Sequence, residues 1–563
     1  MKKPNRPLSV PPSQIESLET RAYLTALNFD APVSVSVGSE PRQVLLADLY
    51  GDGNDDLLAL NSGSTNISFL KGDGDGTFST TQLLAVGDSP SSMALGDLNN
   101  DGNADLVVTN SADNTVSVLL SNGNGTFLPP STFAAGINPV AVAIGTLTGD
   151  GNADLVIADY NQSTLGTVST TISVLMGNGN GTFQAPQTLA VAAGPKAVAI
   201  ADLAGDGTQD ILALSGYGIA TPTDAVTVLM GNANGTFQAA QTFYAGVNPV
   251  AMDVGDFSGG DIPDIAVVNE SNQGTISILQ GNGNGTFGAP QTIAVGSFPQ
   301  SIAVADMNGD GIPDLIVPNA ASDSVSVLLG NGNGTFEPQQ TFAAGSDPVS
   351  VAAGDLNNDG KTDLVAANVQ ANTVSVLLGS FASVVGGVLS INGTSGNDTI
   401  SVVDDGSYTT ATLDGVSTQP YLDSQITSIS VAAGAGDDSV NLSQTVVPAI
   451  IEGQAGSDTL VAGTGLTTLI GGAGDDSLHG GAANDELAGG AGNDTLIGGA
   501  GNALIFTGVG NDSVHGGAGN DTIIAGNGMD TLFGNAGNDS IVGGDVLQDI
   551  YGGPGSDTIT GGT

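Results

Sequence analysis

Aspartate recurs along this 563-residue chain at two fixed intervals. Toward the C-terminus an acidic slot returns every nine residues from Asp458 to Asp557, and nine of its twelve positions hold aspartate. Upstream, an acidic loop returns at intervals of roughly fifty residues, seven times in all. Regular repetition restricts a chain to architectures in which similar units stack on one another. We therefore expect two repeat units of different geometry.

The seven longer repeats share one order of apolar segments and turns. In the sixth, residues 299–336, an alternating apolar segment precedes the acidic loop, two further apolar segments and a Gly-Asn-rich turn. Short strands at even spacing predict an all-β fold, and four strands in each of seven units predict a seven-bladed β-propeller over residues 29–381. The seventh repeat has no fourth strand after Phe381, so we expect residues 29–35 to complete the last blade.

The acidic loop follows the pattern Asp-x-Asn-x-Asp-Gly-x-x-Asp. Side-chain oxygens at positions 1, 3, 5 and 9 and the carbonyl at position 7 suit Ca²⁺, and Gly at position 6 permits the sharp turn. The spacing therefore predicts one calcium ion per complete loop. The three complete loops contain Asp97, Asn99, Asp101 and Asp105; Asp306, Asn308, Asp310 and Asp314; and Asp355, Asn357, Asp359 and Asp363.

The other four loops depart from this pattern. Two lack the ligand at position 3, where Tyr50 and Ala204 stand; they keep Asp48, Asp52 and Asp56, and Asp202, Asp206 and Asp210. The third loop begins with Thr146 and keeps Asp150 and Asp154, and the fifth keeps Asp256 and Asp264. The alternative for every loop is an Asp/Asn/Gly β-turn without metal, and the occupancy of the third and fifth loops stays open.

The strand pattern, the acidic loop and the recurring Gly-x-Gly-Thr-Phe turn resemble FG-GAP/VCBS repeats, the family of integrin-α-like propellers, over about residues 29–381. This resemblance implies a calcium-binding propeller with a role in adhesion.

From residue 453 the chain repeats Gly-Gly-x-Gly-x-Asp-x-apolar-x, for example over 489–497 and 516–524. This pattern is similar to the RTX, or haemolysin-type, calcium-binding nonapeptide. The resemblance implies a parallel β-roll over residues 453–563, in which two nonapeptides form one coil and Ca²⁺ ions lie between successive coils. It also implies export by a type I machine, with folding where calcium is plentiful.

Alternate nonapeptides place the roll's aspartates on two sides. One ladder is Asp458, Asp476, Asp494, Asp512 and Asp530; the other is Asp521, Asp539 and Asp557, with Asp485 isolated between Thr467 and Ala503. These ladders predict about six sites between coils. Without Ca²⁺ the carboxylates would lie about 5 Å apart and repel one another, so we expect the roll to fold only when loaded.

Two further segments flank these arrays. Residues 382–452 contain degenerate RTX turns, at Asp398 and Asp438, among alternating strands, and we expect a β-rich connector that leads into the roll. Residues 1–28 are expected to form a disordered leader, in which 17–24 resemble the LEPR-XLL element of bacterial exported proteins, with Thr20 and Tyr23 as departures.

Composition excludes several partners. With only eight Lys and Arg against 57 acidic residues, the formal charge is −49, so neither nucleic acid nor an anionic membrane surface is an expected partner. Cysteine is absent, which excludes disulfides, and no apolar run is long enough for a membrane span. Cations are the expected partners.

Motifs for catalysis are lacking. The sequence has neither a Gly-x-Ser-x-Gly elbow nor a His-Glu-x-x-His motif, and His479 and His515 are expected to be surface strand residues. Trp is absent and aromatic residues make up 4% of the chain, which argues against a broad sugar-stacking platform. We expect a non-enzymatic, secreted bacterial-type protein, extracellular or at the cell surface, that binds several Ca²⁺ and a surface protein or glycan. The alternatives are a secreted polysaccharide hydrolase or lyase that uses carboxylates, and a structural surface-layer component.

Overall fold

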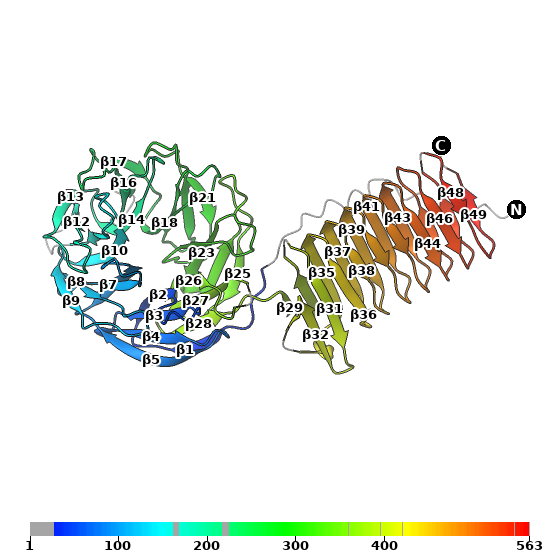
Figure 1. Cartoon of the computed structure of the whole chain (residues 1–563), viewed down its shortest axis with the longest axis horizontal. Helices are drawn as coiled ribbons and strands as arrows, with labels where there is room; N and C mark the ends of the chain where they lie inside the picture. Colours follow the sequence, from blue (N-terminus) through cyan, green and yellow to red (C-terminus); the bar gives the residue numbers. More distant parts are fainter. Residues whose placement is uncertain are drawn as a thin grey trace. The chain divides into compact units, whose positions relative to one another are not determined.

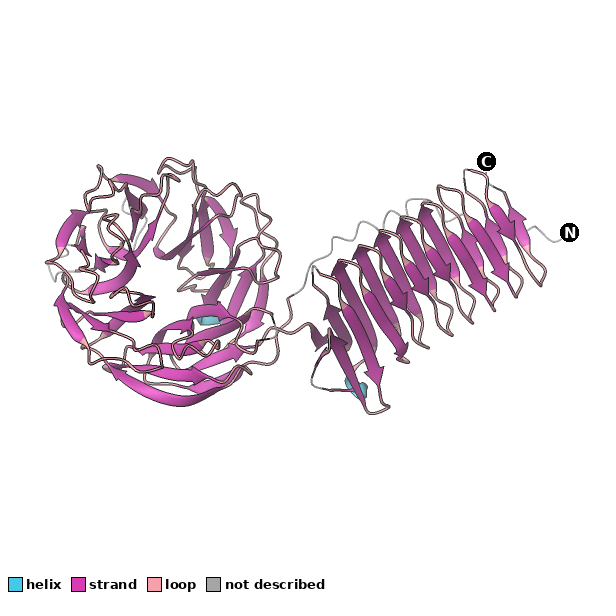
Figure 2. Ribbon diagram, in the orientation of Figure 1, coloured by secondary structure: helices cyan, strands magenta, loops and turns pink. Residues whose placement is uncertain are grey.

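The computed structural model describes residues 27–161, 168–216, 224–358, 360–394, 396–418, 420–544 and 546–561. The predicted leader, with its LEPR-XLL-like element, and Asp359 lie outside these ranges. The described chain is all-β, with two 3₁₀ helices, η2 (Ala320–Ser322) and η3 (Asp423–Gln425), as its helical segments (Figure 2). It forms two compact units, Phe29–Gly379 and a unit that contains Ser380–Thr563. Figure 1 labels the strands of each unit.

The first unit consists of seven four-stranded antiparallel sheets, so the predicted seven-bladed propeller is confirmed (Figure 1). Blades 1 to 3 are β2 (Pro41–Ala47), β3 (Asp56–Asn61), β4 (Asn66–Gly72) and β5 (Phe78–Ala85); β6 (Pro90–Gly96), β7 (Asp105–Asn110), β8 (Thr115–Leu119) and β9 (Ser131–Ala134); and β10 (Pro139–Gly145), β11 (Asp154–Asp159), β12 (Thr171–Leu175) and β13 (Gln187–Ala190). Blades 4 and 5 are β14 (Pro195–Ala201), β15 (Asp210–Ser215), β16 (Ala225–Leu229) and β17 (Gln241–Tyr244); and β18 (Pro249–Gly255), β19 (Asp264–Asn269), β20 (Thr275–Leu279) and β21 (Gln291–Ala294). Blades 6 and 7 are β22 (Ala303–Ala305), β23 (Asp314–Asn319), β24 (Ser324–Leu328) and β25 (Gln340–Ala343); and β26 (Pro348–Gly354), β27 (Asp363–Asn368), β28 (Thr373–Leu377) and β1 (Val33–Ser36).

The N-terminal strand closes the ring, as predicted. Strand β1 pairs antiparallel with β28, with Val33 opposite Val376, and an isolated bridge joins Phe29 to Gly379. Without β1, strand β28 would present an open edge of unpaired backbone groups. The seventh blade therefore contains strands from both ends of the propeller sequence.

The propeller core lies between neighbouring blades. The second strand of every blade is buried along its whole length, which explains its continuous run of apolar residues. Leu58 and Leu60 of blade 1, for example, pack in one cluster with Met93 and Leu106 of blade 2. Each blade thus buries its apolar faces only by stacking on its neighbours, as expected of a closed repeat.

A buried amide ends the second strand in five blades. In blade 2 the Asn110 side chain donates to Ser117 Oγ at 3.0 Å, and Asn61, Asn269, Asn319 and Asn368 make the same bond in their blades. Blade 3 has Asp159 at this position, with 3% of its surface exposed, and its carboxylate accepts a bond from Ser173. Burial raises the pKa of Asp159 to about 6, although the Ser173 hydroxyl acts in the opposite direction.

Replacing this carboxyl by the amide of the other blades should stabilise the propeller. The folded-state pKa of Asp159 lies above the ordinary value of 3.8, so the penalty for ionising it grows from about pH 4 to about pH 6 and is fully present above that range. Asp159→Asn should raise the free energy of unfolding near neutral pH by on the order of 2 kcal/mol and change it little near pH 4. Urea unfolding across this pH range tests the prediction, with Asn110→Asp as the reverse control. Equal stability of Asp159→Asn and wild type at neutral pH would contradict it.

The second unit is a β-roll of two facing sheets (Figure 1). The ten-stranded sheet contains β29 (Ala382–Val385), β30 (Val388–Asn392), β35 (Ser428–Ala435), β37 (Ala449–Ala455), β39 (Thr467–Ala473), β41 (Glu486–Ala491), β43 (Leu504–Val509), β45 (Thr522–Ile524), β47 (Ser540–Val542) and β49 (Thr558–Thr560). The eleven-stranded sheet contains β33 (Val416–Ser417), β32 (Tyr408–Leu413), β31 (Thr399–Asp404), β36 (Ser439–Gln444), β38 (Thr459–Val461), β40 (Ser477–His479), β42 (Thr495–Ile497), β44 (Ser513–Gly517), β46 (Thr531–Asn535) and β48 (Asp549–Tyr551), and β34 (Tyr421–Leu422) pairs with β32.

Both sheets run without interruption from the predicted connector into the predicted roll. Strand β30 pairs in parallel with β35, and β35 with β37, which continues into the nonapeptide strands. The apolar residue of each nonapeptide fills a thin core between the sheets, where Leu460, Leu478 and Leu496 are fully buried. Residues 382–452 therefore form the first coils of the same solenoid.

Aromatic rings stack along one face of the distal coils. His515, Phe533 and Tyr551 occupy the same position in successive coils, with ring centroids 4.8 Å and 4.9 Å apart and nearly parallel planes. This spacing is the separation of adjacent strands, so the ladder follows from the parallel register. His515 is a strand residue, as expected, but the stack itself was not predicted.

Candidate calcium sites

The turns of the roll stack so closely that several positions tolerate only glycine. A Cβ atom on Gly472 would lie 2.1 Å from the carbonyl oxygen of Gln454 in the preceding coil, and one on Gly474 would lie 2.1 Å from that of Gly456. Both glycines also have positive φ angles, 117° and 133°, which side-chain-bearing residues rarely adopt. The Gly-Gly-x-Gly pattern is therefore a consequence of coil stacking, and it brings carbonyl oxygens to the same edge as the aspartates.

One carboxylate oxygen of each ladder aspartate holds the preceding coil. Asp476 Oδ1 accepts the backbone N–H of Asp458 at 2.8 Å, and Asp494 Oδ1 accepts that of Asp476 at 2.9 Å. The same bond joins Asp494 to Asp512 and Asp512 to Asp530 on this side, and Asp521 to Asp539 and Asp539 to Asp557 on the other. The aspartates are thus structural links between coils.

From Asp438 onward, the second carboxylate oxygen is left without a partner wherever the next coil also carries aspartate, whereas Asp398 Oδ2 accepts the Thr394 N–H. In the described part of the roll, Oδ2 is buried and makes no hydrogen bond in Asp438, Asp458, Asp476, Asp494, Asp512, Asp521 and Asp539. By contrast, Asp530 precedes Gln548, whose amide donates to its Oδ2 at 3.0 Å, and Asp485 precedes Ala503 and accepts the Gly481 N–H at 2.7 Å. Because a buried, unpaired carboxylate oxygen is strongly unfavourable, these positions require a further ligand.

Backbone carbonyls converge on these oxygens. A Cβ atom on Gly471 would lie 2.3 Å from Asp476 Oδ2 and 2.5 Å from the carbonyl oxygen of Gly489 in the next coil. The same cradle recurs at Gly453, Gly489, Gly516 and Gly534. Carboxylate and carbonyl oxygens are the ligands that Ca²⁺ takes, so the residues present fit this ion. In the coil of Asp512 the corresponding glycine is replaced by Thr507, which is buried.

The electrostatics of the ladder also favour a cation. Burial is the main cause that raises the pKa of Asp476 to about 7, and the charges of Asp494 and Asp458 add to it. Burial likewise raises the pKa of Asp438, Asp494 and Asp530 to about 6. A divalent cation between the coils would offset both the burial and the repulsion of like charges.

The ladder begins two coils earlier than the sequence predicted. Asp438 Oδ1 accepts the backbone N–H of Asp398, and Asp458 Oδ1 accepts that of Asp438. These partners are 40 and 20 residues apart, whereas the later ones are 18 apart, so the nine-residue count did not reach them. The available signal was the Gly-x-Asp turn at each position.

The propeller loops differ from the roll in one respect: the aspartate at position 9 is fully engaged by the backbone. In the second loop, Asp105 Oδ2 accepts the Leu98 N–H at 3.0 Å and Oδ1 accepts the Ser121 N–H at 2.7 Å. Asp56, Asp154, Asp210, Asp264, Asp314 and Asp363 bridge the same two segments of their blades and are equally buried. Position 9 therefore has a structural role that the loop pattern did not reveal.

The remaining loop residues form a turn near the surface. At position 1, Asp48, Asp97, Asp202, Asp256, Asp306 and Asp355 each accept the backbone N–H five residues later. At position 5, Asp52, Asp101, Asp150, Asp206 and Asp310 each accept the N–H two residues later, and Asp52 also pairs with Lys71 at 2.7 Å. At position 3, Asn99 and Asn308 donate to the position-5 carboxylates at 2.9 Å, and Asn357 occupies the same place in the seventh loop.

Within the described ranges, no three Asp, Glu, His or Cys side chains are grouped as a metal centre. In the roll, most of the oxygen atoms that converge at each proposed site are backbone carbonyls, which do not belong to such side-chain groups. In the propeller the loops adopt turns closed by their own hydrogen bonds, and calcium in these loops stays a prediction.

The two roles within one loop can be separated by mutation. Asp105→Ala would leave the buried N–H groups of Leu98 and Ser121 unpaired, and we expect it to lower the free energy of unfolding by about 2 to 4 kcal/mol even with a calcium chelator present. Asp101→Ala, at the exposed position 5 of the same loop, should change it by less than about 0.5 kcal/mol under these conditions. Urea unfolding in chelator measures both. A stable Asp105→Ala variant would show that position 9 matters only for metal binding.

The two units together define an all-β repeat protein that joins a seven-bladed propeller to a parallel β-roll. The FG-GAP-like repeat model matches residues 48–108, 97–157, 147–213, 261–317 and 319–366. The RTX calcium-binding nonapeptide repeat model matches 461–496, 470–505, 497–528, 524–545 and 549–563. The chain is therefore a calcium-binding repeat protein built of FG-GAP-like repeats followed by RTX repeats, which confirms both resemblances.

No curated protein matches the chain. Among solved structures, an Agrocybe aegerita lectin that recognises non-reducing terminal N-acetylglucosamine is 20% identical, covering 59% of this chain and 86% of its own, with a TM-score of 0.39. Virginiamycin B lyase from Staphylococcus aureus is 11% identical, covering 62% and 99%, with a TM-score of 0.42. A functionally unknown protein from Desulfotomaculum acetoxidans is 16% identical, covering 55% and 88%, with a TM-score of 0.40. At these values the neighbours' ligands and activities do not transfer. No helix among the described residues has the length and apolar character of a membrane span.

Proposed function

We propose that this is a secreted, extracellular and non-enzymatic protein whose roll binds several Ca²⁺ ions, folds only when they are bound, and carries an adhesive propeller. The seven buried Oδ2 atoms without a partner are the observation that carries the proposal. They occur where aspartate follows aspartate in the next coil, and the two aspartates followed by Gln548 and Ala503 have partners. The unpaired oxygens thus correspond to the six predicted intercoil sites and to one more at Asp438.

Calcium would couple folding to location. The roll's apolar core is thin, and its coils are joined through carboxyls whose ionised form is disfavoured by burial. Binding free energy must therefore supply part of the folding free energy. Such a roll stays unfolded where Ca²⁺ is scarce and folds where the Ca²⁺ concentration is as high as that at which extracellular calcium-binding modules are occupied. This supports secretion and an extracellular location.

The adhesive face of the propeller is proposed to lie opposite the acidic loops. The turns that precede the inner strands expose Ile137, Val247 and Phe298, with exposed fractions of 58%, 53% and 37%. The acidic loops follow the other end of the same strands, so apolar contacts and charge occupy opposite rims. Exposed apolar side chains gathered on one rim are typical of a surface that binds a partner.

Calcium-coupled folding can be tested by circular dichroism and calorimetry of the full-length protein in calcium and in chelator. We expect a thermal transition of the roll only in calcium, with the propeller transition retained in chelator, since the position-9 aspartates of the propeller are paired by the backbone. An unchanged spectrum and a single unchanged transition would contradict the proposal.

A pair of adjacent aspartates provides a matched control. Asp476 is buried and belongs to two of the proposed sites, whereas Asp475 is exposed and carries the same charge. In a calcium titration, Asp476→Asn should shift the folding midpoint to about tenfold higher calcium or more, and Asp475→Asn by less than about twofold. Equal shifts would mean that overall charge, and not the ladder, determines calcium dependence.

Adhesion can be tested with glycan arrays and whole cells. Val247→Ser combined with Phe298→Ser should reduce binding of the calcium-loaded protein, since both remove apolar contacts from the proposed face. Leu83→Ser, on the outer strand β5 and 64% exposed, is the control and should bind as wild type does. Equal binding by all three proteins would exclude this face, and cleavage of acidic polysaccharides by the purified protein would contradict the non-enzymatic assignment.

A further inference from the structure

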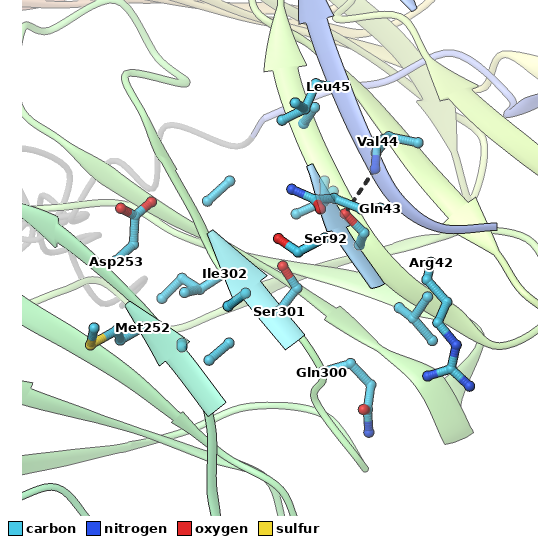
Figure 3. Close-up of a pocket in the computed structure, with 18 of the residues that line it drawn as sticks. Arg42, Gln43, Val44, Leu45, Ser92, Met252, Asp253, Gln300, Ser301 and Ile302 are labelled. Carbon is cyan, nitrogen blue, oxygen red and sulfur yellow. Dashed lines mark hydrogen bonds between the residues drawn. The ribbon is translucent and has the colours of Figure 1, made fainter. Parts of the chain in front are cut away.

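The inner strands of all seven blades enclose a cavity of about 550 Å³ within the propeller (Figure 3). Strands β2, β6, β10, β14, β18, β22 and β26 contribute its walls. Because the strands are repeats in a common register, each level of the cavity is a ring of seven equivalent residues, and departures within a ring are readily identified.

Asp253 departs from its ring. The equivalent residues of the other blades are Leu45, Ala94, Ala143, Ala199, Ala303 and Ala352. The Asp253 carboxylate accepts the Val254 N–H at 2.8 Å and is also hydrogen-bonded to the backbone of Val304 in the next blade, and in the described part of the chain no Lys or Arg forms an ion pair with it. Burial raises the pKa of Asp253 to about 6, although its backbone hydrogen bonds act in the opposite direction. In a ring that otherwise contains alanine and leucine, this carboxylate costs desolvation free energy, which its backbone hydrogen bonds offset in part. It lies in residues 214–260, between the matched FG-GAP-like ranges.

A second departure lies in the adjoining blade. Strand β23 contains Pro318, where the other second strands have Leu60, Thr109, Ala158, Leu214, Val268 and Ala367. Pro318 accepts the Gln300 N–H through its carbonyl but has no N–H to donate toward the inner strand, so this ladder is interrupted. Strand β22 accordingly spans three residues, whereas each of the other six inner strands spans seven. Ser301 therefore lies outside strand β22, which follows the blade of Asp253 in the ring.

The ring two residues from Asp253 is polar on one side. It contains Gln43, Ser92, Ser301 and Ser350 on blades 1, 2, 6 and 7, and Ala141, Ala197 and Ala251 on the others. Gln43 bonds to both backbone groups of Met93, and Ser350 Oγ accepts the Val44 N–H, so these two join blades. Ser92 and Ser301 line the cavity (Figure 3). Among the described residues, their hydroxyls have no hydrogen-bond partner.

We propose that this cavity binds a small polar molecule whose ammonium group pairs with Asp253 and whose other polar group hydrogen-bonds to the Ser92 and Ser301 hydroxyls, on the ring two residues away. An ammonium group can pair with a single carboxylate, whereas Ca²⁺ requires six or more oxygen ligands. The other charged residue of the lining, Arg42, is on β2 of blade 1, three positions and so about 10 Å along that strand from the ring of Asp253, and it donates to Ser62. A cation bound at Asp253 therefore has no positively charged side chain of the cavity lining close enough to compete for the carboxylate. This site does not depend on calcium-coupled folding of the roll.

The test uses 1,4-diaminobutane as the probe and 1,4-butanediol, of similar length but uncharged, as its control. Calorimetric titration of the full-length, calcium-loaded protein in physiological salt should show one saturable diamine site and no comparable site for the diol. Asp253→Asn should weaken diamine binding about tenfold or more, because the ionic partner is lost. Glu337→Gln removes the same charge from an exposed position on the outer hairpin and should bind as wild type does.

A second variant guards against an indirect effect of Asp253→Asn on folding. Ala352→Leu places in blade 7 the residue that blade 1 already carries as Leu45, so it fills the cavity without changing charge. It should also weaken diamine binding about tenfold or more, since the probe can no longer enter. Equal diamine affinities of wild type, Asp253→Asn and Ala352→Leu would overturn the proposal, and so would the absence of a single-site isotherm in the wild type.

Discussion

A buried carboxylate needs a partner for each of its two oxygens, and both units of this protein are organised around that requirement. In the propeller, the position-9 aspartate of every blade receives backbone N–H groups at both oxygens, as Asp105 does from Leu98 and Ser121. In the roll, the ladder aspartates from Asp438 onward receive an N–H at Oδ1 and, where another aspartate follows, nothing at Oδ2. The hydrogen bonds of the buried aspartate are therefore complete in the propeller loops and incomplete in the roll.

This difference separates the stability of the two units. The propeller closes on itself through β1 and β28, and backbone N–H groups pair both oxygens of its position-9 aspartates, so we expect its fold not to require a cation. The roll stacks coils at strand separation, which brings carbonyl and carboxylate oxygens together with no N–H groups left to pair them. A cation that accepts oxygen ligands is the simplest way to complete such an edge, and the glycine cradles leave the room for it.

Much of this arrangement was predictable because it repeats. The two aspartate intervals predicted the propeller, the closing strand and the roll, since each depends on a local pattern copied many times. Asp398 and Asp438 were recognised as degenerate RTX turns but were not placed in the ladder, because longer loops separate the early coils and only strand pairing reveals their register. The structural role of Asp105 and its equivalents was also not predicted, since a loop pattern cannot show whether a carboxylate points into the blade or toward a metal ion. Asp253 and Pro318 lie in apolar strands, and their shared location appears only when the ring closes.

Two buried carboxylates with similar pKa values show why position in the repeat decides their interpretation. Asp159 replaces an asparagine that is buried in five other blades, keeps the bond to the neighbouring serine, and so occupies a place that the fold already provides for a polar group. Asp253 replaces alanine or leucine, lines a cavity, and adjoins the one inner strand that a proline has shortened. A substitution that the fold accommodates explains the first. In the second case two neighbouring blades depart from the repeat beside the same cavity, and a ligand in the cavity gives both departures the same physical reason.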